Sequence, residues 1–130
     1  MSAKILVLYH SQSGNTEKLA KMIATEVGGA VVSITDEVDL SAAEVVFVGT
    51  PNIAASASPQ MKEFLGSIDL SGKMVVPFCT HGMGGLQNVA DDIASLCPNS
   101  TILQSFAIKG EEVASAPEKL KAWLAEIKIA

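Results

Sequence analysis

A polar turn, YHSQSGNT at residues 9–16, lies between a short apolar run and a helical pattern. Residues 5–8 are all aliphatic, which is typical of a parallel strand that is buried on both faces. Between residues 19 and 27, apolar side chains recur with the spacing of one helix face. The turn therefore connects a buried strand to the start of a helix. Free N–H groups and the helix dipole favour an anion there, and we expect a phosphate.

The rest of the chain repeats the alternation of strand and helix. Further strands are predicted at residues 30–34, 45–49, 74–79 and 101–108. A second helix begins at Pro59 with Ser58 as its cap, a third covers residues 86–94, and a capping box at Ser115 and Glu118 starts the last helix. Five strands and about four helices favour an α/β fold with a doubly wound parallel sheet in three layers.

One connection in this pattern is unusually short, and the last helix carries the only tryptophan of the chain. The connection between the second and third strands spans only about ten residues, so it holds at most one helical turn. Trp123 falls on the apolar face of the last helix, and we expect it in the core rather than at a ligand.

Composition limits the function classes. With 130 residues and 48% hydrophobic content, we expect one domain over residues 1–130. The net charge is −5 and all nine basic residues are lysines, which argues against nucleic acid or an anionic membrane as a partner. Neither a signal peptide nor a run near 18 apolar residues is present, so we expect a cytoplasmic location. We expect Cys79 and Cys97 to stay reduced and expect no metal.

The turn resembles the phosphate loop of the flavodoxins, S/T-x-S/T-G-N-T, through Ser11, Ser13, Gly14, Asn15 and Thr16. The segment 48–51 (VGTP) is similar to the family's G-[ST]-P after the third strand, and residues 78–82 are similar to its segment after the fourth strand. The resemblance implies the strand order 2-1-3-4-5 and flavin mononucleotide (FMN) as the cofactor. The alternative to a phosphate loop is an ordinary serine-rich turn between a strand and a helix, with Thr16 as the N-cap residue of the helix.

Under that order, three loops meet at the carboxyl edge of the sheet, where ligands bind in such folds. The resemblance implies cofactor contacts from these loops at His10, Ser11, Gln12, Ser13, Gly14, Asn15, Thr16, Thr50, Pro51, Asn52, Ile53, Ala54, Thr80, His81, Gly82, Met83, Gly84 and Gly85.

The sequence departs from the family where flavodoxins commonly stack an aromatic on each face of the ring. The two relevant loops offer Asn52 to Ala54 and His81 with Met83, so we expect the flavin to be held mainly by its phosphate and by backbone contacts. His81 is either a ligand of the flavin or an exposed loop histidine. Carboxylates of residues 36–39 and 111–112 either border the crevice, where they would lower the flavin potential, or form a plain solvated surface.

Three functions stay open. The first is a small electron carrier that works between larger redox proteins with basic or mixed surfaces. The second is a flavin-dependent reductase of quinones or similar acceptors with a nicotinamide donor, which gains from an uncovered ring. The third is a flavin-free signalling or scaffold domain whose turn holds another anion.

Overall fold

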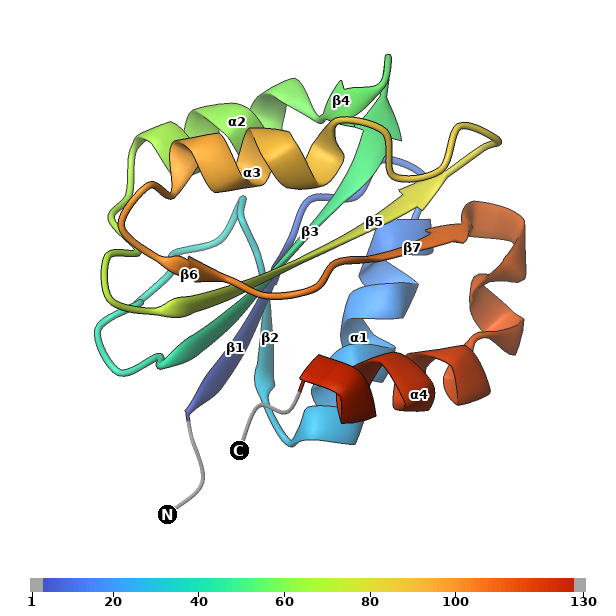
Figure 1. The fold of residues 1–130 in the computed structure, drawn as a ribbon, viewed down its shortest axis with the longest axis horizontal. Helices are drawn as coiled ribbons and strands as arrows, with labels where there is room; N and C mark the ends of the chain where they lie inside the picture. Colours follow the sequence, from blue (N-terminus) through green and yellow to red (C-terminus); the bar gives the residue numbers. More distant parts are fainter. Residues whose placement is uncertain (1–3, 128–130) are drawn as a thin grey trace.

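The computed structural model describes residues 4–127, which form a sheet with helices on both faces (Figure 1). The helices α2 (Pro59–Gly66) and α3 (Val89–Leu96) lie on one face, and α1 (Asn15–Val27) and α4 (Pro117–Ile127) lie on the other. Each helix places its apolar stripe against the sheet. This is the predicted three-layer arrangement.

The main sheet is parallel and has the order β2-β1-β3-β5-β6. Its strands are β1 (Ile5–Tyr9), β2 (Ala30–Ser33), β3 (Val45–Ile53), β5 (Met74–His81), β6 (Thr101–Ile102) and β7 (Phe106–Lys109). Since β5 is the predicted fourth strand, and β6 with β7 the predicted fifth, the order 2-1-3-4-5 is confirmed. From β1 the chain adds β2 on one side and β3 on the other, so the strand order switches between β1 and β3. A crevice opens at the carboxyl ends of the strands at such a point.

The predicted strand at residues 101–108 is divided into β6 and β7, and both segments pair with β5. Between the pairs Val75–Ile102 and Phe78–Phe106, the edge strand has one residue more than β5, which is a bulge. The carbonyl of Gln104 accepts a hydrogen bond from Trp123 Nε1 at 2.8 Å. This carbonyl is therefore turned toward α4 rather than toward β5.

A buried apolar cluster lies on each face of the sheet. On the side of α1 and α4, Trp123 meets Phe47 edge to face at 5.8 Å between ring centroids and stacks on Phe106 at 4.9 Å. On the side of α2 and α3, Met61 and Ile93 are fully buried. The prediction that Trp123 belongs to the core is confirmed.

The predicted loop at residues 50–58 is largely a β-hairpin. β3 continues to Ile53 and pairs with the short antiparallel strand β4 (Ser56–Ala57). Ala54 and Ala55 make the turn with φ values of 53° and 70°. Ser58 then caps α2 by accepting a hydrogen bond from the Met61 amide at 3.2 Å, as predicted.

The predicted capping box before the last helix is wrong. Residues Gly110–Ser115 form a 3₁₀ helix, η1, and the Ser115 hydroxyl donates to the Glu112 carbonyl at 3.0 Å within it. The hydroxyl completes this turn instead of receiving an amide of α4, which starts at Pro117.

Two further features concern connections and helix lengths. Residues 34–44 join β2 to β3 through turns without a helix, in keeping with the short connection expected. Within residues 4–127, no helix has the length and apolar character that crossing a membrane requires.

Candidate functional site

A cavity of about 480 Å³ lies at the carboxyl edge of the sheet. This volume is within the range of small-molecule sites, about 300–1,000 Å³. Its walls come from the starts of α1 and η1 and from the ends of β3, β5 and β7. The lining residues are Ser13, Asn15, Pro51, Asn52, Thr80, His81, Gly82, Met83, Lys109, Gly110 and Glu111.

The turn between β1 and α1 forms one wall. Gly14 precedes the helix in the left-handed region (φ 93°), and its amide donates to the Ser11 hydroxyl at 3.0 Å. That bond fixes the turn, so Ser13 and Asn15 line the cavity. The first amides of α1 begin beside them, and helix starts of this kind attract anions.

Thr16 joins this turn to the end of β5. Its Oγ1 lies 2.7 Å from Thr80 Oγ1, and both residues are buried. Thr80 lines the cavity, whereas Thr16 lies behind it. The alternative of Thr16 as a helix cap is excluded, because α1 begins at Asn15 and Gly14 is the cap residue.

His10 and Thr50 are directed toward α2 rather than into the cavity. His10 Nδ1 lies 2.8 Å from Ser58 Oγ, and the Ser58 amide donates to Thr50 Oγ1 at 2.9 Å. Because Ser58 Oγ already accepts from Met61, its proton is free to reach Nδ1 of a neutral His10. Burial lowers the pKa of His10, which is consistent with the neutral ring.

The hairpin and the loop after β5 are tied together across the top of the cavity. Asn52 Nδ2 donates to the Gly85 carbonyl at 2.7 Å and to Gln87 Oε1 at 2.9 Å. Asn52 therefore lines the cavity while it positions a loop. The other predicted residues lie outside the lining: Ser11, Gln12 and Gly14 of the first turn and Ile53, Ala54, Gly84 and Gly85 of the later segments, in addition to His10, Thr16 and Thr50.

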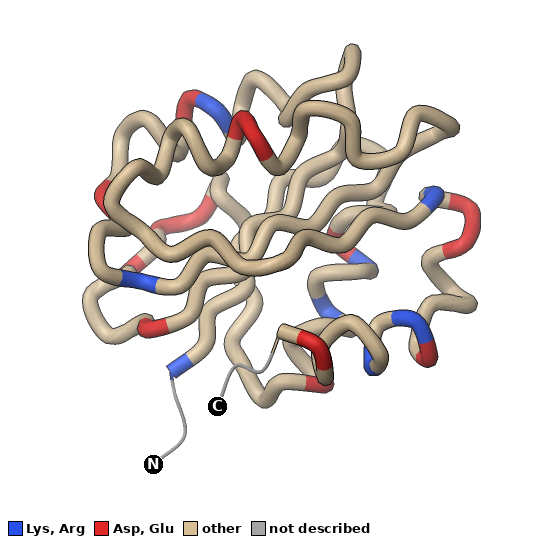
Figure 2. The backbone as a smooth tube through the Cα atoms, in the orientation of Figure 1, with Lys and Arg blue, Asp and Glu red and all other residues tan. Residues whose placement is uncertain are grey.

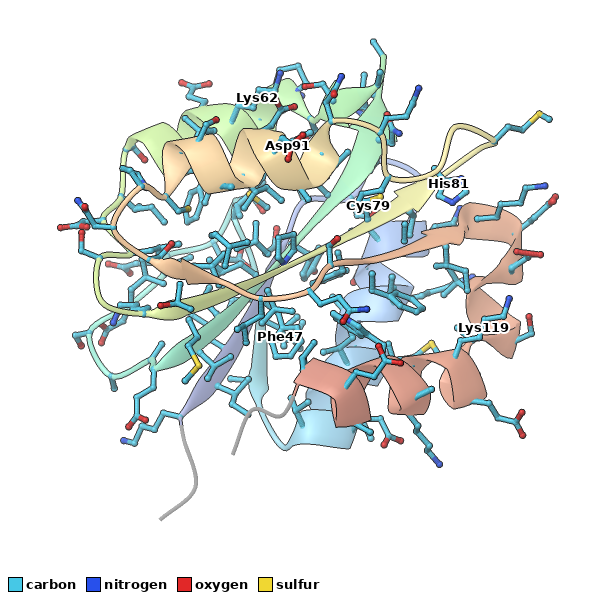
Figure 3. The ribbon with its side chains drawn as sticks, in the orientation of Figure 1. Phe47, Lys62, Cys79, His81, Asp91 and Lys119 are labelled. Carbon is cyan, nitrogen blue, oxygen red and sulfur yellow. The ribbon has the colours of Figure 1, made fainter. Side chains whose placement is uncertain are left out.

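His81, at the end of β5 (Figure 3), and Met83, two residues further along the chain, also line the cavity. His81 Nδ1 is buried and has no hydrogen-bond partner among residues 4–127. A buried polar atom without a partner is costly, and such atoms commonly face a ligand or water. Met83 is 89% exposed, so its side chain covers little of the cavity.

The end of β7 and the start of η1 form a further wall of the cavity, and this wall was not part of the site predicted from the sequence. Glu111 was expected at the edge of the crevice, but Lys109 and Gly110 were not expected to line the site. Gly110 lies against Asn15 so closely that a Cβ would overlap the Asn15 side chain. Their position directly after the predicted fifth strand could have identified them, because the carboxyl end of that strand lies at the same edge of the sheet as the other loops of the site.

The remaining titratable groups do not form a metal site or a reactive thiol. Within the described residues, no group of three or more His, Cys, Asp or Glu side chains is placed to hold a metal ion. Cys79 and Cys97 are buried and free, and burial raises the pKa of both thiols, that of Cys79 to about 12.

These features define a doubly wound α/β protein with a cavity beside its first turn, at the carboxyl edge where the strand order of the sheet switches. A family model described as Flavodoxin matches residues 30–127, and the chain belongs to the flavodoxin family. FMN is the cofactor of this family, so the expectation of FMN is confirmed at the level of the family.

Two relatives in sequence carry the name flavodoxin. The protein of Clostridium saccharobutylicum is 32% identical over 119 residues, which are 82% of this chain and 69% of that protein. The protein of a Nostoc species is 35% identical over 106 residues, which are 74% of this chain and 62% of that protein. The chain therefore spans about two thirds of the length of these relatives.

Solved structures show the same fold. A candidate flavoprotein from Bacteroides eggerthii has a TM-score of 0.83 at 22% identity, covering 99% of this chain and 100% of that one. A flavoprotein from Lactobacillus acidophilus, solved in complex with FMN, has a TM-score of 0.67 at 16% identity, covering 88% of this chain and 98% of that one.

Residues of the cavity fit a phosphate-bearing flavin. The start of α1 offers amides to an anion, the volume suits a small molecule, and His81 Nδ1 is a buried polar atom that still lacks a partner. None of the residues that line the cavity is Phe, Tyr or Trp.

Proposed function

We propose that this chain binds FMN in the cavity and carries electrons between larger redox proteins. The observation that supports this most directly is the convergence of the β1–α1 turn with the ends of β3 and β5 at one cavity of suitable size. When bound, FMN supplies the redox chemistry, and the protein supplies position and electrostatics.

The predicted residues divide into two roles under this proposal. Ser13 and Asn15 hold the phosphate at the start of α1, while Pro51, Asn52, His81 and Gly82 border the ring. The residues behind the lining keep these loops in place, as the bonds of Ser11, Thr16 and His10 illustrate. FMN binding then depends on a turn whose conformation is already fixed by hydrogen bonds within the protein.

The two glycines that cap α1 allow a controlled test of the phosphate site. Gly14 and Gly28 both have positive φ, 93° and 70°, and a Cβ on either meets nothing within 4 Å. Valine strains the backbone at both positions, but only Gly14 belongs to the turn at the cavity. We expect Gly14→Val to weaken FMN binding at least tenfold and Gly28→Val to leave it within about twofold. Equal affinities of the two variants would refute the proposed phosphate site.

The negative net charge of the chain favours partner proteins with basic or mixed surfaces. The net charge is −5, and Figure 2 shows acidic residues alone on α3 and residues of both signs on the other helices. Electrostatic attraction of this kind accelerates encounter and weakens with salt. We propose such partners, and a cytoplasmic location, for this chain.

A second candidate function is a flavin-dependent reductase of quinones. It is favoured by the absence of an aromatic wall and by the exposure of Met83, which together leave room for a second planar molecule. Steady-state oxidation of NADH or NADPH with a quinone distinguishes the two functions. The carrier proposal predicts negligible turnover without an added reductase, and rapid turnover by the FMN-loaded chain alone contradicts it.

A further inference from the structure

Lys109 is the only basic side chain among the cavity-lining residues other than His81. Residues 10–16, the turn at the phosphate site, contain no lysine. We propose that Lys109 pairs with the phosphate of the bound nucleotide and supplies the positive charge that this turn lacks. The inference rests on the proposed function and assigns a specific ligand group to a residue that sequence reasoning left outside the site.

The position of Lys109 follows from the contact between η1 and α1. Gly110 lies against the side chain of Asn15, the first residue of α1. The Cα of Lys109 is one trans peptide away from Gly110, about 3.8 Å. Lys109 lines the same cavity as Ser13, and its ammonium group is carried on a flexible four-carbon stem. Lys109 can therefore reach the space in front of the first amides of α1.

The existing partner of Lys109 leaves its charge available. Its Nζ lies 3.9 Å from Glu111 Oε1, and the two side chains are 38% and 79% exposed. A long, exposed ion pair contributes little. A phosphate monoester carries about −1.5 to −2 charge at pH 7 and three acceptor oxygens. It competes well with one exposed carboxylate for the ammonium group.

The neighbouring strand gives independent support for a polar ligand at this place. Lys109 is paired in register with His81, whose Nδ1 is buried without a partner among the described residues. Figure 2 shows the basic position at the end of β7 followed directly by the acidic start of η1. The lining thus combines one cation, one exposed carboxylate and one histidine whose Nδ1 lacks a partner among the described residues.

The test compares FMN with riboflavin, which has the same ring and side chain but no phosphate. Lys109→Met removes the charge and keeps the apolar stem. Lys119→Met, on the exposed side of α4, is the matched control because it changes the net charge equally (Figure 3). Both ligands are titrated calorimetrically into the unmodified chain and each variant, at low and at moderate salt.

We expect Lys109→Met to raise the Kd of FMN about three- to tenfold and to leave that of riboflavin unchanged. Lys119→Met should leave both ligands within about twofold, and the salt dependence of FMN binding should decrease only in Lys109→Met. Glu111→Gln should strengthen FMN binding, because it removes the competing carboxylate.

Two outcomes overturn the inference while the proposed function stands. One is an unchanged FMN affinity in Lys109→Met, and the other is an equal loss for FMN and riboflavin, which would place Lys109 at the ring. If the unmodified chain binds neither ligand, both the inference and the proposed function fail.

Discussion

The ring of Phe78 occupies the space that a side chain at Gly49 would need. A Cβ built on Gly49 overlaps three atoms of that ring, and both residues are paired neighbours in the central strands β3 and β5. Phe78 is fully buried, so the ring has no free volume into which to move. The Phe78 ring therefore packs directly over the backbone of Gly49, where there is no room for a side chain.

We expect Gly49→Ala to lower the free energy of unfolding by about 3 kcal/mol, since overpacking in a rigid core forces backbone shifts. Gly66→Ala is the control: Gly66 is exposed at the end of α2, and a Cβ there meets nothing within 4 Å. Its stability should change by less than about 1 kcal/mol. Urea unfolding measures both, and similar values for the two variants would contradict this packing.

The paired hydroxyls of Thr16 and Thr80 predict non-additive effects. Thr16→Val leaves the Thr80 hydroxyl buried without its partner, which should cost about 1–2 kcal/mol of stability. The double variant removes both hydroxyls and should cost less than the sum of the single variants. Additive losses would show that the two side chains do not interact. Thr16→Ala should also weaken FMN binding, because the turn loses its attachment to β5.

Asp92 predicts a pH-dependent contribution to stability. It accepts from the Ser56 hydroxyl and from the Ala57 amide at 3.2 Å, and Lys62 Nζ lies 3.8 Å away. The Ser56 bond first, and then the Ala57 amide and Lys62, hold the pKa of Asp92 below its ordinary value despite partial burial.

Because the folded-state pKa is depressed, the stabilisation is complete above the unfolded value and is lost as pH falls through the folded value. We expect Asp92→Asn to cost about 1 kcal/mol at pH 7 and progressively less below about pH 4. Urea unfolding between pH 2.5 and pH 7 checks this. A difference that is independent of pH would contradict it.

The two cysteines predict chemical inertness of the folded chain. Both thiols are buried, and burial raises the pKa of Cys79 to about 12 and also raises that of Cys97. The thiolate is the reactive form, so almost none is available at pH 8. Iodoacetamide should label neither residue in buffer and both in concentrated urea, as read by mass spectrometry. Rapid labelling of the native protein would exclude this burial.

Local patterns were sufficient to predict the elements around the first turn. Aliphatic runs and helical spacing located β1, α1, β3 and α2, because each signal depends on a few adjacent residues. Ser58 was predicted as a cap from its position before Pro59, and the structure confirms the bond. Two of the cavity walls therefore follow from sequence alone.

The remaining wall depends on contacts between distant segments. The bulge between β6 and β7 is stabilised by Trp123, nineteen positions from Gln104, and it sets where Lys109 and Gly110 fall. Likewise, Thr16 and Thr80 are sixty-four positions apart. No local pattern reveals such pairs, which is why the sequence predicted the turn but not which of its hydroxyls face the cavity.

Equilibrium dialysis of the purified chain against FMN measures whether the chain binds this nucleotide. We expect saturation at one FMN per chain, with competition by inorganic phosphate at high concentration and with weaker retention of riboflavin. Equal flavin concentrations on both sides of the membrane, at saturating FMN and with the chain shown to be folded, would contradict it.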